Sequence, residues 1–484
     1  MTVVRLLSCV VLLVCSSVAN AEPVTAIIGA TLIDGTGGAP VKDAVIVIDG
    51  RKIAAVGPRD RVTIPTGARK VNVAGKYIIP GMMDANVHLV LGSSIEFIVR
   101  YEGRYEDLIE EAAQVALKNG LTTVFDSWGP LQPLINVRDR INRGDIVGSR
   151  TFIAGNIVGF SGPFGRDFNA AAETTATKPL VRRINRIWEE NTGPDLLWST
   201  PEQVRREIKR YISRGIDFLK YGASGHREED FLQFSPEAQQ VIVQECHEAG
   251  IIAQTHTTSV ESLRQALEAG VDMLQHGSVT GPTPMPDAAI KLMIDKKVYC
   301  AVQPRTAKRL AIELEQAEDA LPSRRAKERL QTWHDNEVKL IKARAPLLLA
   351  TDAGMMDPDA YESMKPKLRI ERPTELGEAH FLWFKAMVEK GMTPMEAIVS
   401  ATRNIAAAYH KLDEFGTLEA GRLADLVVLD ANPLQDINNI RKISMVMKDG
   451  QVVDRDKLPL KKVLSVPRSA PPRTSTSTQN GGGK

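Results

Sequence analysis

The feature that most constrains the fold is an alternation, through the middle of the chain, between short apolar runs and amphipathic stretches. The runs are rich in β-branched residues and short enough for strands, whereas stretches such as 105–119, 201–214, 236–249 and 260–269 repeat their apolar residues at helical spacing. Eight strands are expected, near 82–88, 122–127, 151–158, 216–222, 251–256, 272–276, 298–303 and 346–351. Strands with interposed helices predict an α/β fold of the (β/α)8 TIM-barrel type, although periodicity alone does not separate it from a doubly wound sheet.

Two β-rich segments flank this middle region. In 22–80, the strand-like run 44–48 is followed by the hairpin signal Asp49-Gly50. In 413–465, similar runs at 426–429 and 444–447 precede Asp449-Gly450. We expect both segments to form one small composite β-sandwich beside a barrel that spans 81–412.

The two ends of the chain differ from the rest. Residues 1–21 resemble a cleavable signal peptide, because Arg5 precedes an apolar run at 6–18 and Ala19-Asn20-Ala21 is a small-x-small cleavage pattern. The run is too short for a comfortable membrane span of about 20 residues, so we expect cleavage near Ala21, export to a periplasm or the extracellular space, and no membrane span in the mature protein. Residues 466–484, rich in Pro, Ser, Thr and Gly, are expected to be disordered.

Composition excludes several classes of protein. With 43% hydrophobic and 25% charged residues, the chain can bury a large core and is not globally disordered. The charges nearly balance, at 61 Lys+Arg against 59 Asp+Glu, and no basic stripe carries interleaved aromatic residues, so no nucleic-acid partner is expected. Beyond the leader only Cys246 and Cys300 remain, too few for a disulfide scaffold. We expect two buried free thiols, with a single bridge as the alternative.

Potential metal ligands lie at the predicted carboxyl ends of the strands, which form the active face of a (β/α)8 barrel. They are Asn86, His88, Lys220, His256, His276 and Asp352. A lone His at a strand end is more often an ordinary hydrogen-bonded side chain, and Lys220 could simply pair with a carboxylate. Imidazoles and a carboxylate on several strand ends together favour a divalent cation, with zinc as the first candidate. Lys220 could be a ligand only after carboxylation, since an ammonium repels a cation.

With these residues the chain resembles the amidohydrolase superfamily. The run Gly81-Met82-Met83-Asp84-Ala85-Asn86-Val87-His88 is similar to the start of that family's barrel, and the later ligands follow the family's order. The stretches 400–404 and 416–429 add to the likeness. The presence of Lys220 is similar to the branch that holds Xaa-Pro dipeptidases, related metallo-carboxypeptidases and ochratoxin-degrading amidohydrolases.

The resemblance implies a barrel beside a composite β-sandwich, one or two divalent ions, hydrolysis of an amide-type bond, and a homo-oligomer. In the family's template a carboxylated Lys220 bridges two ions, His88 and Asp352 hold one, and His256 and His276 hold the other. Asn86 departs from the template, which has His at this position, and an amide oxygen is a poorer zinc ligand than imidazole. Three alternatives follow: one ion with Asn86 only hydrogen-bonded, two ions with a weak first site, or an inactive homologue.

The expected chemistry is attack of an activated water on an amide carbonyl, with Asp352 as general base and then general acid. A dipeptide or N-acyl amino acid with a free carboxylate is the first choice of substrate. A lactone or cyclic amide is the second, and a metal-poor ligand-binding protein is the alternative from another class.

Two further groups are weaker candidates for substrate contact. The long segment 159–199 is a candidate lid, and its arginines, Arg166 among them, could bind a substrate carboxylate. The alternative is a solvated basic helix at 180–190. Tyr221, which follows Lys220, could contact substrate or simply pack at its strand end.

Overall fold

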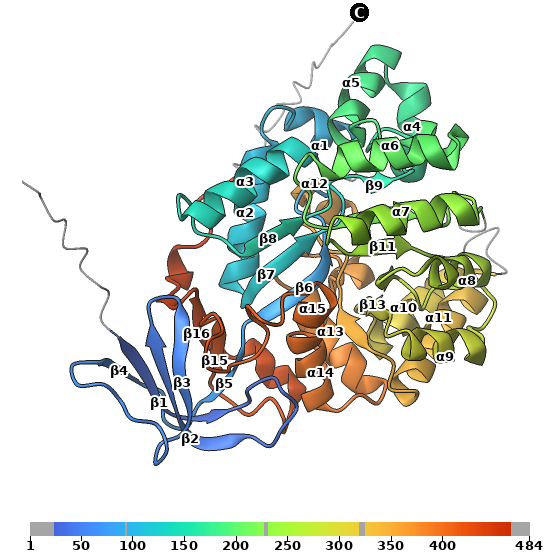
Figure 1. Ribbon diagram of the computed structural model, residues 1–484. Helices are drawn as coiled ribbons and strands as arrows, with labels where there is room; N and C mark the ends of the chain where they lie inside the picture. The colour runs from blue at the N-terminus through green and yellow to red at the C-terminus, as the bar shows by residue number, and fades with distance from the viewer. Residues whose placement is uncertain (1–23, 92–93, 227–230, 319–324, 466–484) are drawn as a thin grey trace, which may run out of the picture.

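The computed structural model describes residues 24–91, 94–226, 231–318 and 325–465 (Figure 1). The predicted leader, 1–21, and the predicted disordered tail, 466–484, lie outside these residues. Within them, no helix is both long enough and apolar enough to cross a membrane.

The middle of the chain forms two parallel sheets whose strands follow one another in chain order, as a barrel requires. One sheet has the order β6-β7-β8, and the other runs from β9 through β10, β11, β12 and β13 to β14. The strands are β6 (Met82–Val87), β7 (Leu121–Asp126), β8 (Arg150–Ile153), β9 (Ile157–Val158), β10 (Leu219–Gly222), β11 (Ala253–His256), β12 (Met273–Gln275), β13 (Tyr299–Val302) and β14 (Leu347–Leu349). Every predicted strand is present, but the run predicted at 151–158 is divided into β8 and β9.

Backbone hydrogen bonds bring the first and last of these strands together. The Asp352 amide donates to the Asn86 carbonyl at 2.7 Å, and the His88 amide donates to the Ala353 carbonyl at 2.8 Å. Residues Val87 and Ala353 form a parallel bridge there. No continuous ladder joins the two sheets within the described part of the chain, so the fold is TIM-barrel-like, and its first and last strands meet at the end that carries the predicted ligands.

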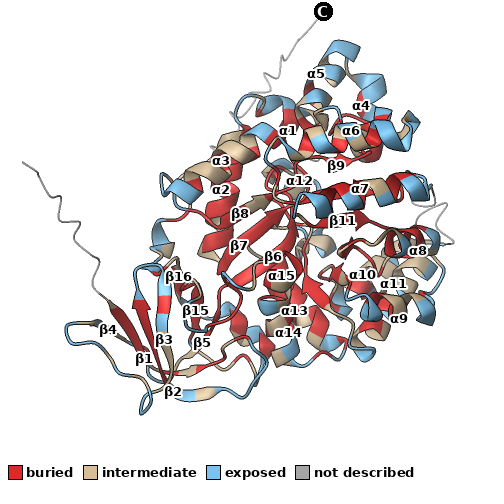
Figure 2. Ribbon diagram, in the orientation of Figure 1, coloured by how far each residue is buried: buried red, intermediate tan, exposed pale blue. Residues whose placement is uncertain are grey.

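Helices connect the strands and cover their outer side (Figure 1). Their ends follow ordinary capping rules: Thr200 and Gln203 form a capping box at the start of α6, and Pro201 occupies the first turn, where a missing N–H costs nothing. Buried residues lie along the strands, while exposed residues lie on the outward helix faces (Figure 2). Outside the segment 159–199, the α-helices are α1 (Ile95–Arg100), α2 (Tyr105–Lys118), α3 (Leu131–Arg143), α6 (Pro201–Ile212), α7 (Pro236–Glu248), α8 (Val260–Ala269), α9 (Asp287–Asp295), α10 (Ala307–Glu318), α11 (Ala326–Lys342), α12 (Pro358–Ser363), α13 (Ala379–Glu389), α14 (Pro394–Ser400) and α15 (Arg403–Ala408).

The two β-rich flanks combine, as predicted, into one sheet with its own core. Strand β5, from the first flank, pairs antiparallel with β15 from the second, and Ile79 lies opposite Val427. The core of this sheet contains Ile27, Ile46 and Leu426, all fully buried. The strands are β1 (Thr25–Leu32), β2 (Val41–Asp49), β3 (Lys52–Pro58), β4 (Arg69–Asn72), β5 (Tyr77–Pro80), β15 (Leu426–Leu429), β16 (Ile443–Lys448) and β17 (Gln451–Val452). Because they form a single eight-stranded sheet, the two-layered sandwich stays a prediction.

A buried ion-pair cluster joins this sheet to the strands of the barrel region. Arg150 on β8 reaches Asp425 with one guanidinium nitrogen, at 2.6 Å, and Asp449 with the other. The Arg150 side chain is only 9% exposed, so removing it would leave two buried carboxylates without this partner, at a large cost in the free energy of unfolding.

Candidate active site

The six predicted ligands lie on five strands, towards their carboxyl ends, and in the residues that follow them. Asn86 is on β6, Lys220 on β10 and His256 at the end of β11. His276 and Asp352 follow β12 and β14, and both have left-handed backbone conformations, with φ of 56° and 58°. Such a conformation is uncommon for residues other than glycine and often marks a functional position.

The Asp352 carboxylate is the centre of the cluster. Its Oδ1 lies 2.8 Å from His88 Nε2 and accepts a hydrogen bond from Asn86 Nδ2 at 2.9 Å. Its Oδ2 accepts from Gln303 Nε2 at 2.8 Å and lies 3.7 Å from His276 Nε2. The side chain is nevertheless 24% exposed, so water and a substrate can reach it.

A directional chain of hydrogen bonds leads from Lys220 to this carboxylate. Lys220 Nζ donates to Ser127 Oγ at 3.0 Å, the Ser127 hydroxyl donates to Asn86 Oδ1, and the Asn86 amide nitrogen donates to Asp352. Both ends of the Asn86 amide are therefore engaged in hydrogen bonds. This arrangement favours the alternative in which Asn86 orients the cluster without binding metal.

The remaining imidazoles lie side by side next to Asp352. The rings of His256 and His276 are 5.3 Å apart between centroids. His226, in the residues that follow β10, has its ring 5.6 Å from the His256 ring between centroids and donates through Nδ1 to the Asp167 carbonyl at 2.8 Å, since a carbonyl can only accept.

Burial and neighbouring charges set the protonation of these groups. Burial lowers the pKa of Lys220 to about 8, against the opposing effect of the Asp352 and Asp126 charges. Burial also lowers the pKa of His276 to about 4. For Asp352, burial alone would raise the pKa, but the neighbouring His276 and His88 imidazoles hold it well below its usual range. A carboxylate that stays ionised at neutral pH can accept a proton.

The donor types suit a divalent cation, although the described residues contain no group of three or more His, Cys, Asp or Glu side chains already arranged around one. His88 Nδ1 faces the Trp128 carbonyl at 3.3 Å, which requires an N–H there and turns the lone pair of Nε2 towards Asp352. A lone pair facing a carboxylate is favourable only with a proton or a cation between them. His256 Nε2 is likewise buried without a hydrogen-bond partner among the described residues. By these two observations the residues fit a cation.

Two of the predicted substrate contacts are not brought to the cluster. Tyr221 is completely buried, and its hydroxyl donates to Gln239 on α7 at 3.1 Å, because alternate residues of a strand point to opposite sides. Its role here is packing. Arg166 begins α4 (Arg166–Thr175) with its side chain half exposed and 4.0 Å from Asp167.

The predicted lid segment contains α4 and α5 (Lys178–Glu189). Phe168 on α4 stacks on Trp128 at 3.9 Å between ring centroids, next to the cluster. The arginines of α5 face solvent, as the alternative of a basic surface helix proposed, and Arg183 pairs with Glu102. Closure of this segment as a lid stays a prediction.

Sequence reasoning missed several residues that surround the cluster. Ser127, Trp128 and Gln303 directly follow β7 or β13, so the same strand-end position would have found them, but only metal-ligand residue types were considered. Asp84 was also missed. Its carboxylate accepts hydrogen bonds from the backbone N–H of Asn86, at 3.1 Å, and from Thr351, and so connects β6 to the residues after β14.

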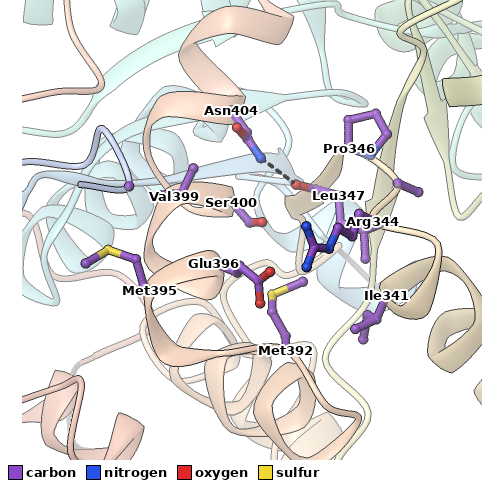
Figure 3. Close-up of a pocket in the computed structure, with 12 residues that line it drawn as sticks. Ile341, Arg344, Pro346, Leu347, Met392, Met395, Glu396, Val399, Ser400 and Asn404 are labelled. Atoms are coloured by element: carbon purple, nitrogen blue, oxygen red, sulfur yellow. Dashed lines mark hydrogen bonds between the residues drawn. The ribbon is translucent and has the colours of Figure 1, made fainter. Parts of the chain in front are cut away.

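A cavity of about 310 Å³ lies elsewhere, beside the amino end of β14. Ile341, Arg344, Met392 and Glu396 line it, and Asn404 donates to the Leu347 carbonyl at its edge (Figure 3). Because Leu347 begins β14 whereas Asp352 follows it, this cavity is at the opposite end of the strand from the cluster.

Comparison with known proteins identifies relatives along nearly the whole chain. The sequence profile of the Amidohydrolase family matches residues 77–453. The chain is 28% identical to ochratoxinase from Aspergillus niger over 458 residues, which cover 89% of this chain and 86% of that enzyme. The solved structure of molinate hydrolase shares 40% identity with a TM-score of 0.87, covering 93% of this chain and 99% of that one. The structure of phenylurea hydrolase B shares 38% identity with a TM-score of 0.86, covering 92% of this chain and 100% of that one.

Proposed function

The chain belongs to the amidohydrolase family and is an enzyme that acts on C–N bonds, and from that premise we propose that it is a metal-dependent hydrolase of small amide-type substrates. The observation that carries the proposal is the convergence of His88, His276 and Gln303 on the partly exposed Asp352 carboxylate. The similar enzymes ochratoxinase, molinate hydrolase and phenylurea hydrolase B are named for substrates other than simple peptides, so the search for a substrate extends beyond peptides.

The candidate metal ligands are His88, Lys220 as its carboxylated form, His256, His276 and Asp352, of which a single catalytic ion with a bound water would take about three. A divalent cation, zinc in the first instance, would polarise the scissile carbonyl and lower the pKa of a water from 15.7 to about 7. Because Asn86 is engaged at both ends of its amide, a single ion is the proposed stoichiometry.

The side chains of the cluster divide the remaining work. Asp352 accepts a proton from the attacking water and delivers it to the leaving nitrogen, so that the amide and water become an acid and an amine. Asn86 and Gln303 each donate to one oxygen of this carboxylate and hold its orientation. The lowered pKa of Asp352 keeps it anionic, which the first of these transfers requires.

The aromatic side chains beside the imidazoles suit an apolar acyl part of the substrate. Phe160 lies 5.4 Å from the His256 ring and Phe168 lies 5.1 Å from the His226 ring, both measured between centroids. We therefore propose aryl-acyl compounds as first substrates to test, among them the N-acyl amino acids and dipeptides favoured from the sequence. Cyclic amides and lactones belong in the same screen.

Substitution of Asp352 by Asn tests the proposed chemistry. The variant keeps the shape of the side chain but cannot accept a proton at neutral pH, so kcat on any substrate found in the screen should fall by about 10²–10⁴-fold. Turnover near that of the wild type would remove Asp352 from the mechanism. A wild-type protein with less than stoichiometric metal and no hydrolytic activity would support the ligand-binding alternative.

Export and self-association complete the proposal. The pattern at 1–21 supports cleavage near Ala21 and release into a periplasm or the extracellular space. Sequencing of the mature amino terminus, with Glu22 expected first, tests the export. Light scattering on the purified protein tests the homo-oligomer, which rests on family resemblance alone.

A further inference from the structure

A small polar cavity adjoins the candidate active site. It has a volume of about 120 Å³ and lies between the residues that follow β13 and those that follow β14. Gln303, Arg305, Arg309, Glu313, Trp333 and Thr351 line it, and we call it the Arg305 cavity. Two of these residues connect it to the cluster, since Gln303 donates to Asp352 and Thr351 is the residue before Asp352.

The cavity has an excess of positive charge. Arg305 Nε and Arg309 Nε are both 2.7 Å from the Glu313 carboxylate, so two guanidinium groups share one acid. Arg309 also donates to the Leu368 and Glu371 carbonyls, which satisfies its other side.

Arg305 retains donor capacity that nothing in the described chain uses. Its Nη1 is buried and has no hydrogen-bond partner among the described residues. The guanidinium lies 3.5 Å from the centre of the Trp333 ring, and stacking fixes the plane in which its free N–H groups point. An unsatisfied buried donor on a charged group is costly unless a ligand completes it, and a planar carboxylate is the group that guanidinium binds best.

We propose that the Arg305 cavity binds the carboxylate of the leaving group, so that the substrate is an N-acyl amino acid or a dipeptide with a small carboxyl-terminal residue. The inference rests on the proposed function, because Asp352 must deliver its proton to the leaving nitrogen, and the cavity lies on the Asp352 side of the cluster. Its volume equals that of about four waters at their share of liquid volume, which admits a carboxylate with a few carbon atoms.

Paired substrates and an Arg305→Met variant test this proposal. The substrates are N-benzoyl derivatives of glycine, alanine and proline, each as the free acid and as the carboxamide, with benzoate release followed by mass spectrometry. The metal-loaded wild type should favour the free acids at least tenfold in kcat/KM. Arg305→Met should lower kcat/KM for the free acids about 100-fold and change it less than threefold for the carboxamides, while Arg305→Lys should recover part of the loss.

Arg138→Met is the matched control, because Arg138 is similarly buried, 14% exposed against 12%, and pairs with Asp217 instead of lining the cavity. It should keep the wild-type preference. Equal use of acids and carboxamides by the wild type, or a preference that survives in Arg305→Met, overturns the carboxylate subsite while leaving hydrolysis itself intact. If no compound is turned over, dissociation constants from calorimetry replace kcat/KM. Binding of the free acids to the wild type at least tenfold more tightly than to Arg305→Met supports the carboxylate subsite. A smaller difference, or no binding, overturns it.

Discussion

Replacing Asn86 by Ala separates a positioning role from a metal-ligand role. In the structure, Asn86 is completely buried, accepts a hydrogen bond from Ser127 and donates one to Asp352 at 2.9 Å. The substitution removes the donor to a charged acceptor, a bond worth about 1.5–3 kcal/mol. If that stabilisation is fully expressed in the transition state, kcat should fall by about 10- to 150-fold.

Metal content decides between the two roles. A positioning residue predicts that Asn86→Ala retains the wild-type metal stoichiometry, measured by plasma mass spectrometry, while kcat falls. Ser127→Ala interrupts the same hydrogen-bond chain, so the double variant should lose less than the product of the two single losses. Ser224→Ala is the control, since this buried hydroxyl bonds to Thr258 and has no contact with Asp352. Metal lost together with Asn86, or an unchanged kcat, would refute the reasoning.

Two further predictions concern stability. Arg150→Met leaves Asp425 and Asp449 without their buried partner and should lower the free energy of unfolding by about 3–5 kcal/mol. Arg51→Met removes a 64% exposed arginine from the same Asp449 and should lower it by at most about 1 kcal/mol. Equal losses in urea denaturation would contradict a stabilising role for the buried Arg150 cluster. Burial lowers the pKa of His380 to about 3, so its contribution to stability is present above the unfolded-state pKa of about 6.5 and is lost as pH falls towards 3. Between pH 6.5 and 5.0 this loss lowers the free energy of unfolding by about 2 kcal/mol, and His380→Gln should remove that part of the pH dependence. An unchanged dependence of the free energy of unfolding on pH would exclude His380 as the group responsible.

Much of the fold could be predicted from the sequence because its strands and helices have different hydrophobic periods. All predicted strand positions in the middle region are present, and the hairpin signals at Asp49-Gly50 and Asp449-Gly450 lie at the turns between β2 and β3 and between β16 and β17. The division of 151–158 into β8 and β9 was not predicted, because an apolar run does not reveal that Gly155 breaks it with a φ of 74°.

The candidate site was predictable only in part. Strand-end positions identified His88, His276 and Asp352, which the structure brings together. Tyr221 was misplaced, because adjacency to Lys220 in the chain puts it on the opposite side of the strand. Gln303 was missed although it directly follows β13, because a neutral amide is not an ordinary metal ligand and its contact with Asp352, 49 residues away in the chain, is visible only in the structure.

The most direct test of the proposed hydrolase is metal removal and restoration on the protein expressed as residues 22–484, the proposed mature form. The protein is treated exhaustively with a chelator, its metal content is measured by elemental assay, and hydrolysis of the N-benzoyl substrates is followed before and after zinc is added back. We expect activity to disappear with the metal and to return as zinc approaches one ion per chain. Full activity in protein shown to be free of metal would contradict the proposed metal-dependent hydrolysis.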